Sequence, residues 1–247
     1  MAQPRHLTRP PIKEALIDIR VAPDTPVTSE RLAPLRSALA DRYPVVDERQ
    51  NIQAELRVEG GKLMPRSQSA FGGIWFKTAD DQQIAQFRPD GFTLNQVMTY
   101  VDGGVLVDEA LRLWELYKSV AGQLVVTRLA MRYINELQLP YRPEDDFRRF
   151  LTEPARLPED GSPQQFSSYL TRVVAHEGPD VIVVTQSLDS PGDDKGRVKV
   201  VVDLDVATTE DLSADHSVLM SALLRLRTLK NRVFFSLLTE EAVELFL

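Results

Sequence analysis

Cysteine is missing altogether from the 247 residues of the chain. This absence excludes disulfide bonds, thiolate metal sites and cysteine nucleophiles together. It is also typical of proteins from a reducing compartment, so we expect a cytoplasmic protein. A chain of this length buries enough apolar surface to fold without a disulfide or a structural metal.

Long apolar runs and a basic charge excess are lacking as well. No run approaches the ~18 apolar residues that a membrane span requires, and the opening MAQPRHLTRPP has no apolar core of a signal peptide. The formal net charge is −7, whereas broad binding to a phosphate backbone requires a basic surface. We therefore expect no membrane association and regard nucleic acid as a disfavoured partner.

The sequence also lacks the common motifs of nucleotide-binding sites and hydrolase active sites. It contains no phosphate loop, dinucleotide fingerprint or serine nucleophile elbow. The histidines His6, His176 and His216 are scattered and have no metal-ligand spacing around them. We predict no catalytic residue, no metal and no cofactor, while active sites can still be assembled from residues remote in sequence.

A long alternating stretch from Gln123 to Pro140 is the most regular feature that is present. Its period of two predicts an unusually long strand with one buried face. The opposite face begins apolar and becomes charged at Arg128. The residues predicted to be buried are Val125, Thr127, Leu129, Met131, Tyr133, Leu137 and Leu139.

The elements before and after this strand follow one order twice. Alternation, helical spacing and turn residues predict strand, helix, strands and helix in each half. We therefore predict an α+β protein of two similar halves, residues 1–122 and 123–247, each a mainly antiparallel sheet packed on a long helix. Chance recurrence of the same order, within one domain, is the alternative. The predicted helices span 29–43, 107–121, 144–151, 214–237 and 240–246. The predicted strands span 12–21, 52–58, 74–78, 83–88, 92–98, 123–140, 166–176, 181–188 and 197–206. An irregular connection is predicted over 64–71, and loops are predicted over 152–165 and 190–196.

The charged face of the central strand is the best candidate for a binding site. Arg128 and Arg132 are four residues apart on a strand and so lie on the same side, about 13 Å from each other. Glu136 continues this face, and Arg20 joins it if the opening strand pairs nearby. We rank an ion-pair network first, contact with a ligand or partner second and catalysis last.

Asp203 and Asp205 form a second pattern, with two carboxylates on one side of a later strand. Such a pair can bind a cation or carry out acid–base chemistry. Because no third acid lies nearby in the sequence, we favour a solvated sheet face beside Lys199.

Three segments at the start, the centre and the end of the chain carry a family resemblance. They are PPIKEALIDIRV (Pro10 to Val21), TRLAMRYINEL (Thr127 to Leu137) and LRTLKNRVFFSLLTEEAVELF (Leu226 to Phe246). Together they resemble a sporadically distributed family of uncharacterised bacterial and archaeal proteins. The resemblance brings no activity, but its scattered distribution implies an accessory role, as in defence or toxin–antitoxin systems.

These observations favour a non-enzymatic binding or interaction module. Its expected partner is another protein or a small anionic ligand, and a homodimer is left open. The alternatives are an enzyme that acts on a phosphorylated or anionic small molecule, and a holdase chaperone similar to SecB. A closed polar pocket converging on the arginines would favour the enzyme, and an open apolar groove would favour the chaperone.

Overall fold

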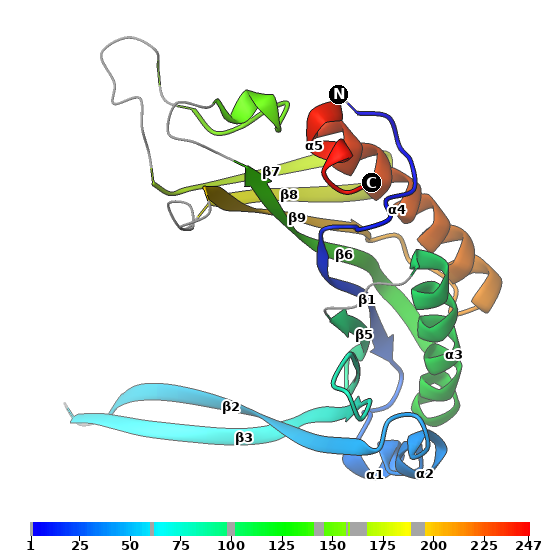
Figure 1. Ribbon diagram of the computed structural model, residues 1–247. Helices are drawn as coiled ribbons and strands as arrows, with labels where there is room; N and C mark the ends of the chain where they lie inside the picture. Colours follow the sequence, from blue (N-terminus) through cyan, green and yellow to red (C-terminus); the bar gives the residue numbers. More distant parts are fainter. Residues whose placement is uncertain are drawn as a thin grey trace.

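A single antiparallel sheet of nine strands forms the centre of the protein (Figure 1). A computed structural model describes residues 2–59, 62–97, 102–140, 146–156, 158, 167–188 and 196–247, without the side chains of 53–59 and 62–68. The strand order is β2-β3-β4-β5-β1-β6-β9-β8-β7. The strands are β1 (Ile12–Pro23), β2 (Val45–Glu59), β3 (Lys62–Lys77), β4 (Gln83–Arg88), β5 (Gly91–Val97), β6 (Leu124–Pro140), β7 (Tyr169–Glu177), β8 (Asp180–Leu188) and β9 (Arg197–Thr208).

The two central strands, β1 and β6, connect the two sides of the sheet. They pair antiparallel, with Ile17 opposite Met131 and Arg20 opposite Arg128. Strands β5 to β2 extend the sheet beyond β1, and β9 to β7 extend it beyond β6. The prediction of an α+β protein with mainly antiparallel pairing is confirmed, but the expectation of two separate sheets is wrong, because the β1–β6 ladder makes them one.

The described helices all lie on one face of this sheet. Figure 1 shows α3 (Gly103–Ala121) and α4 (His216–Ser236) side by side on it, with α5 (Glu240–Glu244) beyond the end of α4. Beneath α3 the core contains Ile17, Trp114 and Tyr117, all fully buried. A second cluster, around Phe150 and Leu204, lies under the end of α4 and α5. No described helix lies on the opposite face, which we call the open face.

The predicted helix over 29–43 is two short helices, α1 (Ser29–Leu32) and α2 (Leu35–Leu39). Pro34 separates them, since proline has no N–H to donate and its ring clashes with the preceding turn. The predicted helix over 144–151 is reduced to one 3₁₀ turn, η1 (Phe147–Arg149), and its first two residues lie outside the described part.

Two strand predictions also need correction. The connection expected over 64–71 belongs to β3, which pairs with β2 along its length. In β6, Val125 is exposed and Val126 is buried, the reverse of the prediction. Here Arg20 pairs with Arg128 while Val21 pairs with Val126. Thr127 is the extra residue of a β-bulge, which shifts the alternation by one position. The loops predicted over 152–165 and 190–196 lie mostly outside the described residues.

None of the helices in the described part of the chain combines the length and the apolar character needed to cross a bilayer.

Candidate functional site

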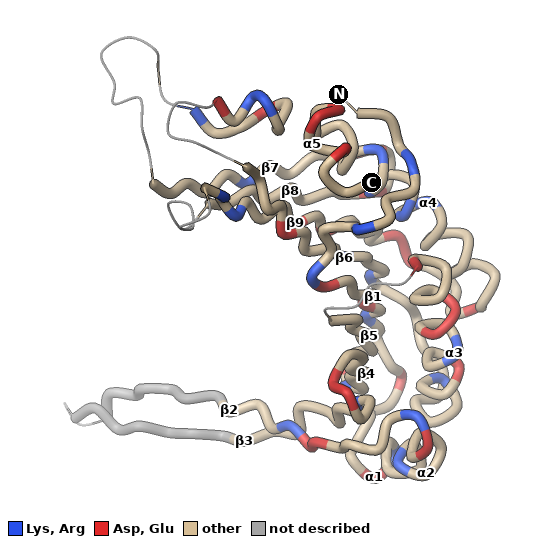
Figure 2. The backbone as a smooth tube through the Cα atoms, in the orientation of Figure 1, with Lys and Arg blue, Asp and Glu red and all other residues tan. Residues whose placement is uncertain are grey.

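The four residues predicted for the site lie together on the open face. Arg20 is on β1, and Arg128, Arg132 and Glu136 follow one another along β6. Figure 2 shows basic and acidic positions close together along these central strands. The period-two pattern therefore placed all four on one surface, as predicted.

Each arginine of this group is already paired with a carboxylate. Arg128 donates to both oxygens of Asp205, each at 3.1 Å. Arg132 donates to Asp203 from Nε and Nη2, at 2.9 and 2.6 Å. The two aspartates thus serve as partners of the arginines, and no cation is needed to explain their spacing.

Asp18 is the buried centre of the network. Asp18 is 7% exposed, and its carboxylate accepts hydrogen bonds from Thr93 Oγ1 at 2.6 Å and Arg88 Nη2 at 2.8 Å. Arg20 and Arg128 donate to its other oxygen, at 3.0 and 3.2 Å. Burial alone would raise the pKa of Asp18, but these hydrogen bonds and the charges of Arg88 and Arg20 outweigh it and hold the pKa below its usual value.

Glu136 continues the network at the other end of β6. Lys199 Nζ lies 3.2 Å and Lys13 Nζ 3.7 Å from its carboxylate, and Gln138 donates to it at 2.8 Å. Burial alone would raise the pKa of Glu136. The hydrogen bond from Gln138 and the charges of the two lysines outweigh burial and hold this pKa below its usual value. These contacts are those of an ion-pair network. A role of the four residues in binding stays a prediction.

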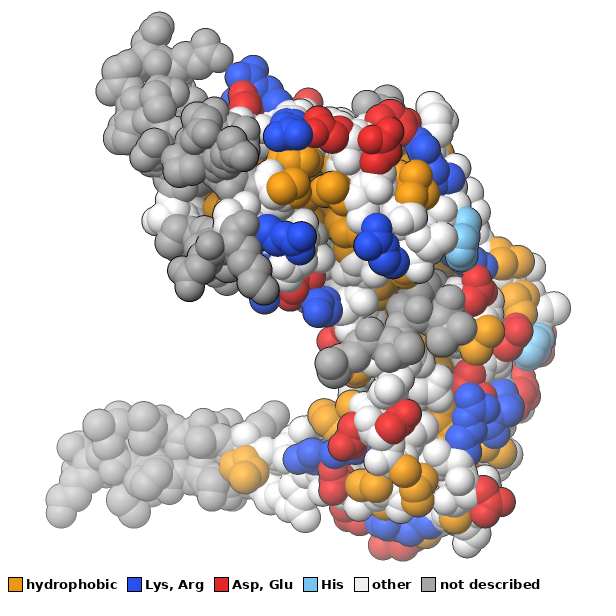
Figure 3. Space-filling view, in the orientation of Figure 1, with side chains coloured by type: hydrophobic (Ala, Val, Ile, Leu, Met, Phe, Trp, Pro, Cys, Tyr) orange, Lys and Arg blue, Asp and Glu red, His pale blue; other side chains and the backbone are white. Residues whose placement is uncertain are grey.

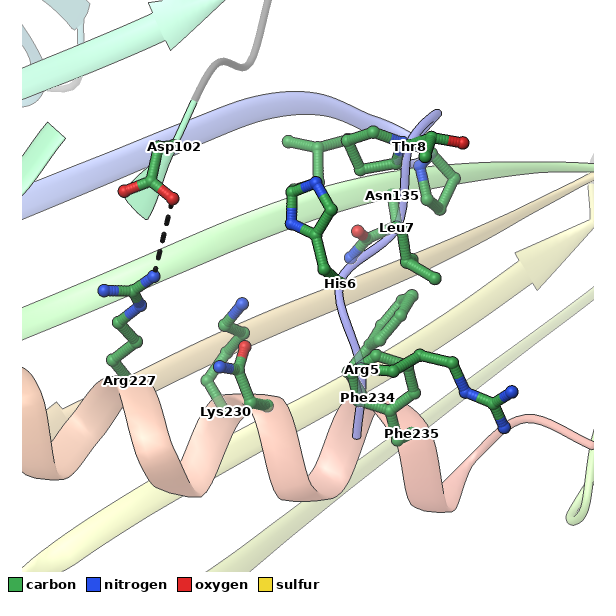
Figure 4. Close-up of a pocket in the computed structure, with 14 residues that line it drawn as sticks. Arg5, His6, Leu7, Thr8, Asp102, Asn135, Arg227, Lys230, Phe234 and Phe235 are labelled. Atoms are coloured by element: carbon green, nitrogen blue, oxygen red, sulfur yellow. Dashed lines mark ion pairs between the residues drawn. The ribbon is translucent and has the colours of Figure 1, made fainter. Parts of the chain in front are cut away.

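A pocket of about 200 Å³ lies on the helical side, between the N-terminal segment and α4 (Figure 4). Its floor comes from α4 and from Asn135 of β6, and Asp102 at the start of α3 closes one end. The residues that line it are Arg5, His6, Leu7, Thr8, Pro10, Pro11, Ile12, Asp102, Asn135, Arg227, Lys230, Asn231, Phe234 and Phe235.

The roof of the pocket is the chain before β1. Main-chain hydrogen bonds fix it to the C-terminal helices: the Ala2 N–H donates to the carbonyl of Leu238 at 2.9 Å, and the Arg9 N–H to that of Phe246 at 3.0 Å. The Arg5 side chain forms an ion pair with Glu240. Pro10 and Pro11 cannot donate main-chain hydrogen bonds, which favours an extended course over α4.

Lys230 is the unusual residue of the pocket. It lies four residues after Leu226 and four before Phe234, so helical spacing places it on the buried stripe of α4. Only 8% of its surface is exposed, and Nζ lies 3.9 Å from the centre of the Tyr133 ring. Among the described residues no carboxylate reaches ion-pair distance from Nζ. Burial lowers the pKa of Lys230 to about 7, and the charge of Arg227 contributes.

The other polar groups around Lys230 leave the pocket with a cationic surplus. Arg227 is one turn earlier on α4, and its nearest carboxylate among the described residues, that of Asp102, is 3.9 Å away. Asn135 is 2% exposed and donates through Nδ2 to the carbonyls of Tyr133 and Val202, at 3.3 and 3.0 Å. Apolar side chains such as Phe234 complete the walls. The arrangement can hold a small anion that has an apolar part.

Metal coordination finds no support in the described ranges. No three histidine, aspartate or glutamate side chains there gather as metal ligands would.

Sequence reasoning missed Lys230 and Asn135, and it treated His6 as an isolated histidine. Two signals were present. Lys230 interrupts an apolar stripe at helical spacing, and Asn135 interrupts the dry face of β6 between Tyr133 and Leu137. A polar residue at a core position indicates a hydrogen-bonded group or a site.

Comparisons with known proteins assign the chain to no family. No protein-family model matches the chain, and no curated protein matches its sequence at a significant level. The resemblance noted for three segments therefore stays a prediction.

Proposed function

We propose that the protein is a non-enzymatic binding module that takes up a small anion in the pocket between its N-terminal segment and α4. The observation that carries this proposal is the buried amine of Lys230, which has no carboxylate partner among the described residues. An uncompensated buried charge costs several kcal/mol. A bound carboxylate or phosphate would supply the missing counter-charge.

The volume and the lining of the pocket restrict which ligands can bind there. Its volume of about 200 Å³ is below the ~300–1,000 Å³ of pockets for drug-sized molecules. The ligand would therefore have few heavy atoms. Leu7 and Phe234 offer apolar contact to the part of the ligand that points away from Lys230.

The test is calorimetric titration with acetate, benzoate, pyruvate and inorganic phosphate. We expect Lys230→Met, which keeps most of the length of the side chain without its charge, to weaken binding of the best of these ligands at least tenfold. Lys199→Met removes an amine from the open face and is the matched control, with unchanged affinity. Equal affinity of wild type and Lys230→Met would exclude this pocket as the site.

A protein partner on the open face is the second candidate. It is supported by exposed apolar side chains at the β7 edge, where Leu170 is 70% and Val174 45% exposed. Strand β8 separates this edge from the ion pairs of β6 and β9. On the side of the molecule drawn in Figure 3, basic and acidic side chains are interspersed, which suits a protein more than nucleic acid as a partner. The centre of this face is polar and self-paired, so it favours neither an arginine-based active site nor a holdase.

The second candidate is tested with the double variant Arg128→Gln/Arg132→Gln. We expect it to fold and to lose the partners that wild type retains in a pull-down. An unchanged set of partners would remove the open face from consideration.

We also infer that residues 1–122 and 123–247 arose by duplication. The strands of each stretch lie on their own side of the β1–β6 pair, which supports the idea. Superposition of the two stretches should place β1 on β6, and failure to do so would end it. The accessory role, the cytoplasmic location and homodimer formation stay predictions from the sequence.

A further inference from the structure

The amine of Lys230 lies in surroundings that suit a nucleophile. It is enclosed by Tyr133, Phe234 and the N-terminal segment, and another cation, Arg227, is one turn away on α4. Burial of the amine and a neighbouring cation both favour the uncharged amine over the ammonium ion. The uncharged amine carries the lone pair that attacks carbonyl carbon, and the pKa of about 7 is consistent with its presence near neutral pH.

We propose that Lys230 captures its ligand covalently and reversibly, as an imine with the aldehyde or ketone group of a small oxo acid. This inference rests on the proposed function, because it names the ligand class of the same pocket. Nothing in it requires turnover, so the protein remains a binding module.

The chemical step balances within the ligand, Lys230 and water. The Nζ lone pair forms a bond to the carbonyl carbon, and the π electrons of the carbonyl move to its oxygen. Proton transfer from nitrogen to oxygen gives a carbinolamine, which loses water as the C=N bond forms. One proton from solvent then converts the imine to the iminium ion. No oxidant or reductant takes part, and hydrolysis reverses the step.

The spacing of Arg227 and Lys230 on α4 favours an oxo acid as the ligand. Side chains three residues apart on a helix lie about 5–6 Å apart at Cβ, and both Arg227 and Lys230 line the pocket. Arg227 is therefore placed to hold a carboxylate while Lys230 reaches a carbonyl on the neighbouring carbon, as in a 2-oxo acid. Its contact with Asp102 is long, 3.9 Å, and is its one ion pair among the described residues, which leaves guanidinium N–H groups to donate.

The contact between Nζ of Lys230 and the Tyr133 ring would stabilise the iminium product. The iminium nitrogen would carry its positive charge near the face of Tyr133, 3.9 Å from Nζ at present. Cation–π attraction at a desolvated site is worth roughly 2 kcal/mol or more. The remaining apolar part of the ligand would contact Phe234 and Leu7.

The experiment traps the imine by reduction. Wild-type protein is incubated with pyruvate and sodium cyanoborohydride, and peptide mass mapping locates the adduct among the seven lysines of the chain. We expect one adduct at Lys230, formed at least tenfold faster than at any exposed lysine. Lys230→Arg should abolish it, and Lys13→Arg, on the open-face side, should leave it unchanged. Labelling spread evenly over exposed lysines would overturn the proposal, whether or not the variants fold.

Lactate separates this inference from the proposed function. It has the carboxylate of pyruvate but a hydroxyl in place of the ketone, so it can bind without forming an imine. We expect lactate to bind and to slow trapping. If lactate and pyruvate bind but no adduct forms at Lys230, the imine is wrong and the anion site stands. If Lys230 is trapped equally by neutral propanal and lactate does not bind, the amine is reactive but the anion site is wrong.

Discussion

Lys230 makes the stability of the ligand-free protein depend on pH. Its folded-state pKa of about 7 lies below the usual lysine value of 10.5. Between these values the unfolded chain binds more protons, so this residue makes stability rise with pH across that window. Its destabilising effect is complete below about pH 7 and fades toward pH 10.5.

Lys230→Met should therefore be more stable than wild type at pH 6, by about 1–4 kcal/mol, with a smaller gap at pH 10. Urea unfolding at both pH values measures the gap. If the two proteins differ in unfolding free energy by the same amount at pH 6 and at pH 10, burial of the charged amine does not destabilise the fold.

Asp18 should behave in the opposite way, because removing its charge breaks a network. In Asp18→Asn, Arg88 and Arg128 would lose a buried acceptor of their charge, and we expect a loss of about 3–5 kcal/mol at pH 7. Asp90→Asn, at an exposed partner of Arg20, is the control and should cost less than about 1 kcal/mol.

The pH dependence checks the same residue. The pKa of Asp18 is lowered in the folded protein, so its contribution is present above the unfolded value of 3.8 and is lost as pH falls through the folded value. Wild type and Asp18→Asn should converge only in strong acid. Convergence already at pH 5 would contradict this.

Residues of the open face could be predicted from the sequence, whereas the pocket could not. Arg20, Arg128 and Arg132 follow from the alternation of one strand and its partner. Lys230 becomes buried because the segment around His6, more than 200 positions earlier in the sequence, folds over α4. Local periodicity carries no information about such a contact.

At the scale of elements, α4 offers a matched pair of positions. Leu226 is fully buried in the core and Leu224, two residues away, is 48% exposed. Leu226→Asp should unfold the protein or leave it insoluble, since an unpaired buried charge costs several kcal/mol against a total of ~5–15. Leu224→Asp should melt within a few degrees of wild type. If both variants stay folded, α4 is not part of the core.

Elements were predictable where their signals are local. Helix α3 ends at Ala121, where the helix predicted over 107–121 also ends, and Gly122 follows with φ +89°, a conformation that glycine adopts without strain. The prediction placed Pro34 inside a single helix over 29–43, whereas the structure has a break there. The bulge at Thr127 left no local signal, because it arises from pairing between β1 and β6.

At the scale of the whole molecule, the order of elements was right and their assembly was not. Hairpin neighbours such as β7 and β8 can be inferred from the turn between them. The pairing of β1 with β6 joins strands that are more than 100 residues apart. This pairing makes one sheet out of what would otherwise be two, and no pattern in the sequence predicts it.

The N-terminal segment crosses the boundary between the predicted halves. Residues 2–11 belong to the first half in sequence, yet they pack on α4 and α5 of the second. Asp102 also comes from the first half, while Asn135, Arg227 and Lys230 come from the second. The chain can therefore be divided at 122/123 into two fragments, each carrying part of one pocket.

Such fragments would act as a sensor. Co-expressed separately, 1–122 and 123–247 should reassemble through the β1–β6 ladder, and a molecule lodged beside Lys230 would tether them. Fused to the parts of a split fluorescent reporter, they should give a signal that grows with the concentration of the pocket's ligand and stays flat with Lys230→Met. An unknown metabolite could then be identified by fluorescence from fractionated cell extract, without any prior assay of activity.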